Sequence, residues 1–421
     1  MRTTPFVTFE NQPPFSVEML RAASSDSVDE LERLAESGAD LNAVGEGGMT
    51  PLMWAVKRGS LNAARFLAGK FGLEDATPRG DTLLMLAARA AQLEMAEWLL
   101  PQVNAREAPP HGWTALMAAT LSGSAEMVSK LLPGSDAKAR NEEGWTALMF
   151  AAKEGPPEMI AALLPHSDAN ACDKHGRTAL MHAASGNRPA AVRVLLTDSD
   201  LLKTAQLEMS PKNSHSWANA LAFAITGQNW DCVELLATPE SGKARDEKNN
   251  TLLMLAAEKR APWEILSVLL RACDPKARGA YGETVLHVAA TRLPVEVVAR
   301  LLPHCDLAAR NDLGRNNHSA GQTAIEAALG YNRTLAVADY LLGQAPEALF
   351  ASVWSQIVAG AFGPVKGADE IPKKLPQAFA RRTAIHEARE LAREMSPGAE
   401  RKERAEGEEP LAPRKKAAPR L

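Results

Sequence analysis

The sequence is poor in cysteine, in aromatic residues and in long apolar runs. Its 421 residues include only four cysteines, Cys172, Cys232, Cys273 and Cys305, and these form neither a CxxC pair nor a disulfide framework. Phe, Trp and Tyr make up 5% of the chain while Ala and Leu are abundant, a balance that favours close-packed helices over strands. These features predict an all-α protein in a reducing, cytoplasmic compartment.

The sequence also lacks the segments that direct a chain to a membrane. The amino-terminal stretch MRTTPFVTFENQPP has one basic residue and no apolar core. No window approaches roughly 18 uninterrupted apolar residues, the length of a membrane-spanning helix. We therefore expect neither a signal peptide nor a membrane span.

Charge is nearly balanced, but it is distributed unevenly. The chain has 47 Lys and Arg against 51 Asp and Glu, a net charge of −4. Residues 364–421 hold 14 basic and 10 acidic residues (+4), which leaves −8 for the rest. An acidic body disfavours nucleic-acid binding, because the phosphates need basic side chains as partners. The basic tail gives only weak support for such binding.

A repeat of about 32 residues is the main positive signal. Similar heptapeptides, such as TPLMWAV and TALMFAA, begin at Thr50, Thr82, Thr114, Thr146 and Thr178, each 32 residues after the last. The series continues at Asn219, Thr251, Thr284 and Thr323, with steps of 41, 32, 33 and 39 residues, and a degenerate copy begins at Val17. Ten copies therefore tile residues 15–349.

Each copy is predicted to form two helices and a turn. Thr146 opens a short helix because its hydroxyl can accept a free N–H of the first turn, and Gly155 ends that helix. A second helix follows from Met159 and stops at Pro165. The segment from Ser167 to Thr178 contains a D-x-x-G turn and predicts the hairpin tip that joins one copy to the next. Residues that tolerate a positive φ recur at the turn position: Gly48, Gly80, Gly112, Gly144, Gly176, Asn249, Gly282 and Gly321.

These motifs resemble the ankyrin repeat. Gly38-Ala39-Asp40-Leu41-Asn42 and Thr50-Pro51-Leu52 match the family pattern closely, and the resemblance covers about four-fifths of the chain. It implies an all-α solenoid and protein–protein interaction. The family's histidine in the first helix is kept only at His287, and methionine takes its place at Met53, Met85, Met117, Met149, Met181 and Met254. We expect methionine packing to replace the inter-repeat hydrogen bonds of that histidine.

The ends and two insertions depart from the repeat. Residues 1–14 are an extension, the acidic first copy suits an amino-terminal cap, and residues 345–362 are predicted to form a carboxyl-terminal capping helix. Nine extra residues near 201–218 and seven near 315–323 lengthen two tips, which either alter the binding surface or are tolerated surface insertions. Residues 363–421 are interpreted as a linker, an amphipathic helix over 375–395 and a disordered charged tail. The sequence leaves three interpretations of the tail open: a segment that docks a partner, an export signal, or a solvated appendage without a role in binding.

Catalytic chemistry finds little support in the sequence. The motifs GxxxxGK[ST], HExxH and GxSxG are absent. His166 and His304 fall at equivalent repeat positions, as do Cys273 and Cys305, so their spacing reflects duplication. We predict no catalytic residue, no cofactor and no metal site.

The candidate binding residues lie where the resemblance implies a concave groove, on hairpin tips and first helices. The residue before the helix-opening threonine is Met49, Asp81, Trp113, Trp145 and Arg177 in successive copies. All of these except Asp81 are predicted to bind the partner, together with further tip residues and residues at the ends of first helices. The full predicted set is Met49, Lys57, Arg58, Arg79, Arg89, Trp113, Leu121, Trp145, Lys153, Arg177, Trp217 and Tyr281. Two successive tryptophans at this position indicate binding anchors, or else rings that pack locally over their own hairpins.

Three function classes follow. The leading hypothesis is a monomeric, non-enzymatic scaffold that binds a protein partner in the groove, with a host-directed bacterial effector as a variant. The second is a regulator or inhibitor of a partner enzyme. The third is a nucleic-acid-associated protein that binds through its basic tail.

Overall fold

The chain is a succession of helix pairs that falls into two compact units. The computed structural model describes residues 17–109, 111–196, 219–245, 249–312, 321–330, 335–359 and 375–395. Unit 1 is Met1–Ala280 and unit 2 is Tyr281–Leu421, a division that the repeat spacing does not predict. Both predicted insertions, Trp217 and the chain beyond Met395 lie wholly or mostly outside the described residues.

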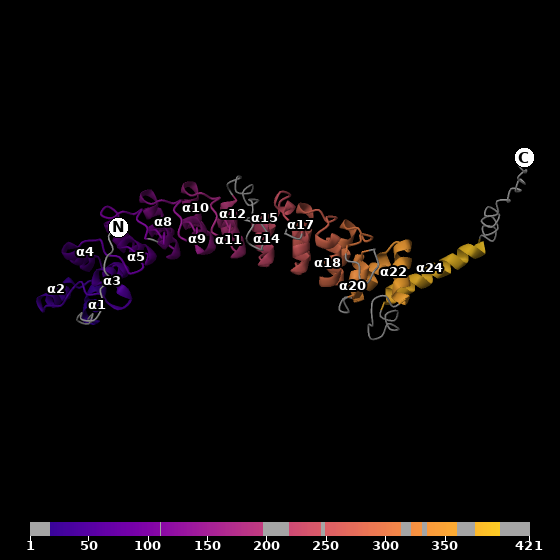
Figure 1. Ribbon diagram of the computed structural model, residues 1–421, viewed down its shortest axis with the longest axis horizontal. Coiled ribbons are helices and arrows are strands. Elements are labelled where there is room, and N and C mark those ends of the chain that lie inside the picture. Colours follow the sequence, from indigo (N-terminus) through magenta and orange to yellow (C-terminus); the bar gives the residue numbers. More distant parts are fainter. Residues whose placement is uncertain are drawn as a thin grey trace, which may run out of the picture. The chain divides into compact units, whose positions relative to one another are not determined.

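Unit 1 is built from pairs of short antiparallel helices (Figure 1). The first helices of its pairs are α1 (Val17–Ser24), α3 (Pro51–Arg58), α5 (Leu83–Arg89), α7 (Ala115–Leu121), α9 (Ala147–Glu154), α11 (Ala179–Ser185), α14 (Ala220–Thr226) and α16 (Leu252–Glu258). The second helices are α2 (Val28–Glu36), α4 (Leu61–Phe71), α6 (Leu93–Leu99), α8 (Ala125–Leu131), α10 (Pro157–Leu163), α12 (Pro189–Leu195), α15 (Trp230–Leu236) and α17 (Trp263–Ala272). First helices pack on first helices and second helices on second helices, which makes two layers.

The helix boundaries follow from local sequence chemistry. The Thr146 hydroxyl accepts the Met149 N–H at 3.3 Å at the start of α9, and the Asn219 side chain accepts the Ala222 N–H at 2.9 Å at the start of α14. The second helix of the Thr146 copy begins two residues earlier than the sequence predicts, at Pro157, because proline fits the first turn of a helix. It ends at Leu163, and a 3₁₀ turn that contains Pro165 follows.

Methionine fills the core where the resemblance implies histidine. Met53, Met85, Met117, Met149, Met181 and Met254 are each at most 4% exposed. The retained histidine makes the expected hydrogen bonds: His287 Nδ1 lies 3.2 Å from the Thr284 N–H, and Nε2 lies 2.9 Å from the Gln322 carbonyl of the next copy. The methionines are therefore buried in the core, as a packing role requires, and their replacement of the inter-repeat hydrogen bonds stays a prediction.

Neighbouring repeats are also joined by backbone and side-chain hydrogen bonds. The Lys174 N–H in one tip donates to the Glu143 carbonyl of the preceding tip at 2.9 Å. At the other end of the first helices, Asn229 Nδ2 donates to the Ala184 carbonyl at 2.7 Å, and Arg188 donates to the Lys153 carbonyl at 3.2 Å. In these two repeats a side chain thus satisfies a carbonyl that the end of the preceding first helix leaves free.

The tips need glycine for two separable reasons, and a pair of substitutions distinguishes them. Gly112 and Gly176 have φ of 73° and 74°, but a Cβ on Gly112 would lie 2.8 Å from the Arg140 carbonyl oxygen, whereas nothing lies within 4 Å of one on Gly176. We predict that Gly176→Ala lowers the free energy of unfolding by about 1 kcal/mol through the left-handed backbone alone. Gly112→Ala should cost roughly twice that, measured by urea unfolding, and equal losses would contradict the close approach of the two tips.

Unit 2 continues the helix pairs and ends in two longer helices. The α-helices of its described residues are α18 (Val285–Arg292), α19 (Val295–Leu301), α20 (Ala324–Gly330), α21 (Leu335–Gln344), α22 (Glu347–Val358) and α24 (Pro376–Met395). The sequence places Leu349, Phe350, Val353, Trp354, Ile357 and Val358 at helical spacing on α22. Of these, Phe350, Val353, Trp354 and Ile357 are buried, whereas Leu349 is half-buried and Val358 is 65% exposed. At the start of α24, Ala378 and the preceding Leu375 are buried, whereas Phe379 and Leu391, which the amphipathic pattern over 375–395 places on one apolar side, are 52% and 56% exposed.

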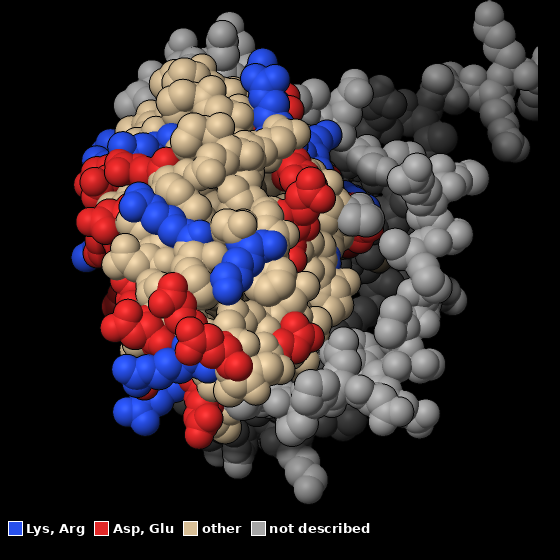
Figure 2. All heavy atoms as spheres, turned by 90° about the vertical axis from the view of Figure 1, so that its left-hand side faces the viewer, with Lys and Arg blue, Asp and Glu red and all other residues tan. Residues whose placement is uncertain are grey.

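The amino-terminal end of unit 1 presents a polar surface. In α2 only Leu31 is buried, and acidic and basic side chains such as Asp29, Glu30 and Arg33 are exposed. Figure 2 views the molecule from this side and shows both signs of charge interspersed with uncharged atoms. A polar outer face is what the first member of a stacked array requires, so a capping role for this copy is our proposal.

Candidate partner-binding face

The hairpin tips and first helices of unit 1 form one continuous side of that unit, called the tip face below. Side chains that touch across repeats on this face, such as Trp113 and Phe150 or Arg177 and Phe223, are 37 and 46 residues apart in the sequence, and the stacking of repeats brings them together. The tip face holds the predicted binding residues of unit 1 that the structure describes. Its centre lies over α7, α9, α11 and α14, where aromatic side chains accumulate.

Four rings in three successive repeats make a continuous set of contacts, called the ring ladder. Phe150 lies between the two predicted tryptophans, with its ring centroid 4.9 Å from that of Trp113 and 4.9 Å from that of Trp145. Trp145 in turn lies 4.1 Å from the ring of His182. The rings are tilted by 36–39°, so the tryptophans pack on intervening rings and are not two free parallel surfaces.

A simple register rule produces the ladder. Each copy opens its first helix with Thr or Asn. The residue just before this Thr or Asn in one copy packs on the residue four places after the Thr or Asn of the next copy. Trp113 packs on Phe150 and Trp145 on His182 in this way, and the Arg177 guanidinium lies 5.3 Å from the Phe223 ring centroid. The tip of one repeat therefore covers the first helix of the next, and both tryptophans are half-buried.

Basic side chains flank the rings. Lys57 Nζ lies 4.9 Å from the Trp54 ring and Lys153 Nζ 5.5 Å from the Trp145 ring, distances typical of cation–π contacts. Lys153 also pairs with the neighbouring Glu154 at 3.2 Å, and Arg89 with Asp81 at 3.5 Å. The cations of both pairs are themselves exposed, at 50% for Lys153 and 44% for Arg89, so they stay accessible to a ligand.

The remaining predicted residues divide into exposed and buried positions. Arg58 and Arg79 are exposed on the tip face, and Leu121 is 43% exposed there. Met49 is buried, at 9% exposure, because its apolar side chain turns into the repeat core, and it therefore offers little contact area. Tyr281 belongs to unit 2, where it is 59% exposed in a left-handed backbone conformation with φ of 56°. Trp217 lies outside the described residues.

Sequence reasoning missed the residues on which the predicted anchors rest. Trp54, Phe150, His182 and Phe223 occupy one position of the repeat, four residues after the helix-opening Thr or Asn. Their shared register and their size were visible in the sequence. What was not visible is that this position faces the tip of the preceding copy.

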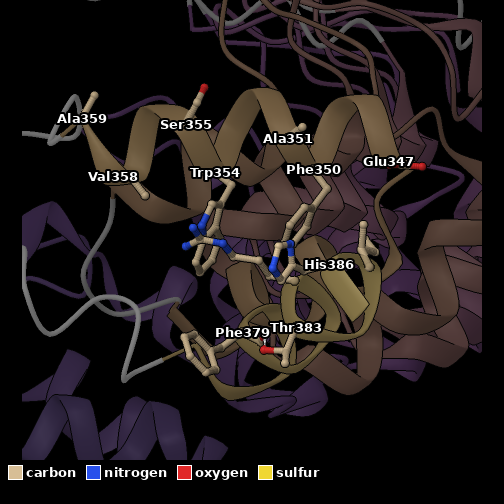
Figure 3. A pocket seen from close by; sticks show the side chains of 12 residues that line it. Glu347, Phe350, Ala351, Trp354, Ser355, Val358, Ala359, Phe379, Thr383 and His386 are labelled. Carbon is tan, nitrogen blue, oxygen red and sulfur yellow. Dashed lines mark hydrogen bonds between the residues drawn. The ribbon is translucent and has the colours of Figure 1, made fainter. Parts of the chain in front are cut away.

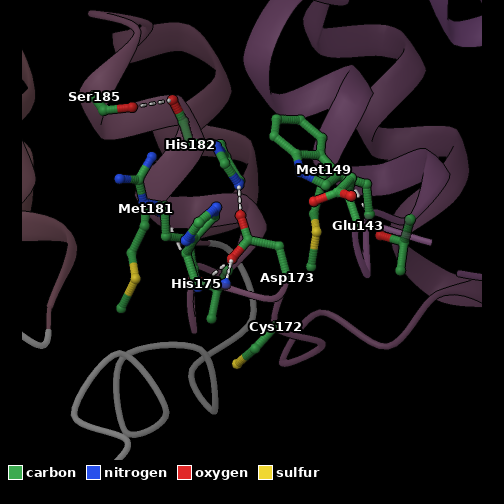
Figure 4. Close-up of polar contacts among 12 residues, drawn as sticks. Glu143, Met149, Cys172, Asp173, His175, Met181, His182 and Ser185 are labelled. Carbon is green, nitrogen blue, oxygen red and sulfur yellow. Dashed lines mark hydrogen bonds and ion pairs between the residues drawn. The ribbon is translucent and has the colours of Figure 1, made fainter. Parts of the chain in front are cut away.

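A buried carboxylate holds the end of the ladder in place (Figure 4). Asp173 Oδ2 lies 3.0 Å from His182 Nε2, while Asp173 Oδ1 accepts the N–H groups of His175 and Arg177 at 2.8 and 2.9 Å. Burial alone would raise the pKa of Asp173, but hydrogen bonds from His182, Arg177 and His175 outweigh it and hold the pKa below its usual value. The carboxylate thus fixes both the D-x-x-G turn and the His182 ring under Trp145.

The charge of Asp173 makes a testable contribution to stability. Asn141 takes the same place one repeat earlier and accepts the N–H groups of Glu143 and Trp145. Asp173→Asn should therefore keep the turn but weaken the hold on His182, and we expect the free energy of unfolding at pH 7 to fall by about 1–3 kcal/mol.

The pH dependence identifies the carboxylate as the cause. Because the pKa of Asp173 is lower in the folded than in the unfolded chain, its contribution is complete above about pH 4, near the unfolded value, and is lost as the pH falls through the folded value. The stability gap between wild type and Asp173→Asn should narrow in urea unfolding at about pH 3 and below. A gap that stays constant over this range would contradict the ionised pair.

Two of the cysteines are shielded by burial. Burial raises the pKa of Cys273 to about 11 and that of Cys305 to about 12, which makes both thiols poor nucleophiles at neutral pH. Across the described residues, no group of three or more His, Cys, Asp or Glu is placed to hold a metal ion. In the same residues, no helix is both long and apolar enough to span a membrane.

Comparison with known families agrees with the helix pairs and their register. A model of three ankyrin-repeat copies matches residues 71–141, 123–206 and 253–349, and a model of many ankyrin-repeat copies matches residues 19–68. This chain is an ankyrin-repeat protein. The family generally serves protein–protein interaction without catalysis, and the predicted all-α repeat solenoid is confirmed.

Many chains of solved structures are also similar to this ankyrin-repeat protein. One matching chain comes from a structure of a predatory endopeptidase from Bdellovibrio bacteriovorus in complex with an immunity protein. It is 29% identical, with a TM-score of 0.38, and the match covers 44% of this chain and 98% of that one. No curated protein matches the chain.

Proposed function

We propose that the tip face of unit 1 binds a protein partner and that the ring ladder is the centre of the contact. The observation that carries this proposal is the set of three half-buried rings, Trp113, Trp145 and Phe150, which pack together over the buried His182 and are flanked by an exposed cation. Tryptophan and arginine are the residues most enriched among binding hot spots, and such hot spots cluster at the centre of an interface.

The mutual packing of the rings supports a binding role. Trp145 is held by Phe150, by His182 and by the Lys153 side chain, so its ring is ordered before a partner arrives. A preorganised anchor loses little side-chain entropy on binding, and more of its contact energy then appears as affinity. Local packing and partner binding are therefore compatible roles for these tryptophans.

The charge around the ladder supports a partner that is acidic where it meets the tip face. Lys57, Lys153 and Arg177 each lie over a ring and direct their charge along the same face. The body of the chain is acidic overall, whereas these basic side chains make the tip face locally positive. This local positive field would orient an acidic partner toward the tip face.

In this proposal the protein acts without chemistry of its own, through the partner that it holds. Its activity in the cell then depends on what the bound surface does, and an array that covers an enzyme's site would inhibit that enzyme. Delivery to a host cell as an effector would use the same face on a different partner.

Capture of the partner tests the proposal. Full-length protein is immobilised and incubated with nuclease-treated and untreated lysate, and bound proteins are identified by mass spectrometry. We expect the same partner in both samples and its loss when Trp113 and Trp145 are both replaced by Ala. Retention that depends on nucleic acid would favour the nucleic-acid hypothesis and overturn this one.

A further inference from the structure

Unit 2 contains a cleft that has no part in the tip face of unit 1. It lies between α22 and the first half of α24 and has a volume of about 860 Å³ (Figure 3). One wall is the α22 face that includes Phe350, Trp354 and Val358, and the other includes Phe379 and His386 of α24. A volume of this size lies within the range of small-molecule sites, which is roughly 300–1,000 Å³.

The second wall is held in place by contacts of α24 with α21. The Asp339 carboxylate accepts the N–H groups of Gln377 and Ala378 at 3.2 and 2.9 Å, which caps the start of α24. Leu375 and Ala378 are fully buried, and the Arg381 guanidinium donates to the Gly343 carbonyl. The cleft is therefore built between anchored helices.

The lining of the cleft is mainly apolar, and part of it is open to solvent. Val358 is 65% exposed and Phe379 52% exposed, whereas Phe350 and Trp354 are 5% exposed and stack with ring centroids 5.5 Å apart. Ile385 adds a further aliphatic surface. Covering this lining with an apolar ligand would remove it from water, which is the main favourable term in small-molecule binding.

Polar donors in the cleft favour a negative charge on the ligand. The Arg382 guanidinium lies 5.2 Å from the Trp354 ring centroid, exposed and with no ion-pair partner among the described residues. The indole N–H of Trp354 is buried at the cleft with no acceptor in the part of the chain that the structure describes. His386 adds a third donor, and the one carboxylate of the lining, Glu347, is on the first turn of α22.

We propose that this cleft binds a small organic anion with an apolar body. The body lies against Val358, Phe379 and Ile385, and the anionic group accepts hydrogen bonds from Arg382. The arginine stacked on Trp354 is preorganised for this role, since its planar guanidinium suits both the ring and a carboxylate or sulfonate. This site is independent of partner binding on unit 1.

Two fluorescent probes that differ in one charged group test the proposal. 1-Anilinonaphthalene-8-sulfonate is an apolar anion, and N-phenyl-1-naphthylamine is the same ring system without the sulfonate. Full-length protein should bind both, as measured by fluorescence titration. Arg382→Gln should weaken the sulfonate probe roughly tenfold and leave the neutral probe unchanged, because the lost contact is a charge-assisted hydrogen bond. Phe379→Ala should weaken both probes several-fold.

Matched variants locate the probes and identify the class of ligand. Leu391→Ser removes an exposed apolar side chain of α24 outside the cleft, and Trp113→Ala changes the tip face; both should leave both titrations unaltered. Dodecanoate should displace the sulfonate probe from wild type. Equal effects of Arg382→Gln on both probes, or insensitivity to Phe379→Ala, would overturn the proposal. So would displacement by an acidic amphipathic peptide but not by dodecanoate, since the cleft would then be a peptide-docking groove.

Discussion

Replacing Trp145 by alanine should weaken partner binding by about 2 kcal/mol or more, the loss expected for a central hot-spot residue. Trp145 is the most connected member of the ring ladder, because it touches Phe150, His182 and the Lys153 ammonium group. Its removal would take away the anchor ring and also free the rings that it orders. Trp113→Ala should have a smaller effect, since Trp113 has a ring contact with Phe150 alone among the described residues.

The same substitution should lower stability, so binding and folding have to be measured together. A half-buried tryptophan with three packed neighbours contributes through burial and ring contacts, and we expect a loss of roughly 2–3 kcal/mol in the free energy of unfolding. Trp98 on α6 is a matched control, since it is also half-buried but belongs to the second-helix layer. Trp98→Ala should reduce the thermal midpoint without changing the dissociation constant of the partner. Equal loss of affinity in both variants would show that the rings matter to the fold alone.

Ending the chain at Ala345 should destabilise unit 2 severely. This truncation removes α22 and α24, and with them the buried side chains of Phe350, Val353, Trp354 and Ile357. At about 1.5–3 kcal/mol for each large apolar side chain, the lost burial amounts to roughly 6 kcal/mol or more. In an array whose members contact only their neighbours, the loss should fall on the adjacent pair, α20 and α21. Hydrogen exchange should show lost protection over residues 324–344.

Two shorter truncations, which remove fewer residues, separate the contributions of α22 and α24. A chain ending at Ala359 keeps α22 but loses α24 and its capping by Asp339, and we expect an intermediate loss of protection in α21. A chain ending at Met395 keeps both helices and should match the full-length protein. If protection in α20 and α21 were unchanged in the Ala345 truncation, α22 would not be a cap.

The fold was largely predictable because one unit of sequence repeats its local signals. Thr146 and its equivalents define the helix starts, and Gly176 and its equivalents define the turns, so each copy supports the interpretation of the others. The apolar face of α22 also follows from periodicity. The helix predicted over 375–395 corresponds to α24, Pro376–Met395, but Phe379 and Leu391 do not share one side of it, because they are 12 residues apart and point about 120° away from each other around a helix.

The geometry of the tip face was predictable only in part. The position before each helix-opening Thr was identified correctly as the tip position, but its environment differs between copies. Met49 turns inward, whereas Trp145 lies across two repeats, and neither outcome is determined by the local sequence alone. Phe150 and His182 occupy the same repeat position, 32 residues apart. Each meets a tryptophan of the preceding tip, Trp113 and Trp145 respectively, only because the repeats stack closely.

Site-specific photo-cross-linking tests the central claim most directly. Leu121 is exposed at the end of α7 on the tip face, and replacing it with benzoylphenylalanine places a reactive group there without removing a buried side chain. Glu94 on α6 is exposed on the second-helix layer and gives the matched control. Irradiation of the captured complex should join the partner to the chain at position 121, in a nuclease-resistant product, and not at position 94. Cross-linking at position 94 but not at position 121 would show that the partner binds the opposite layer and would contradict the assignment of the tip face.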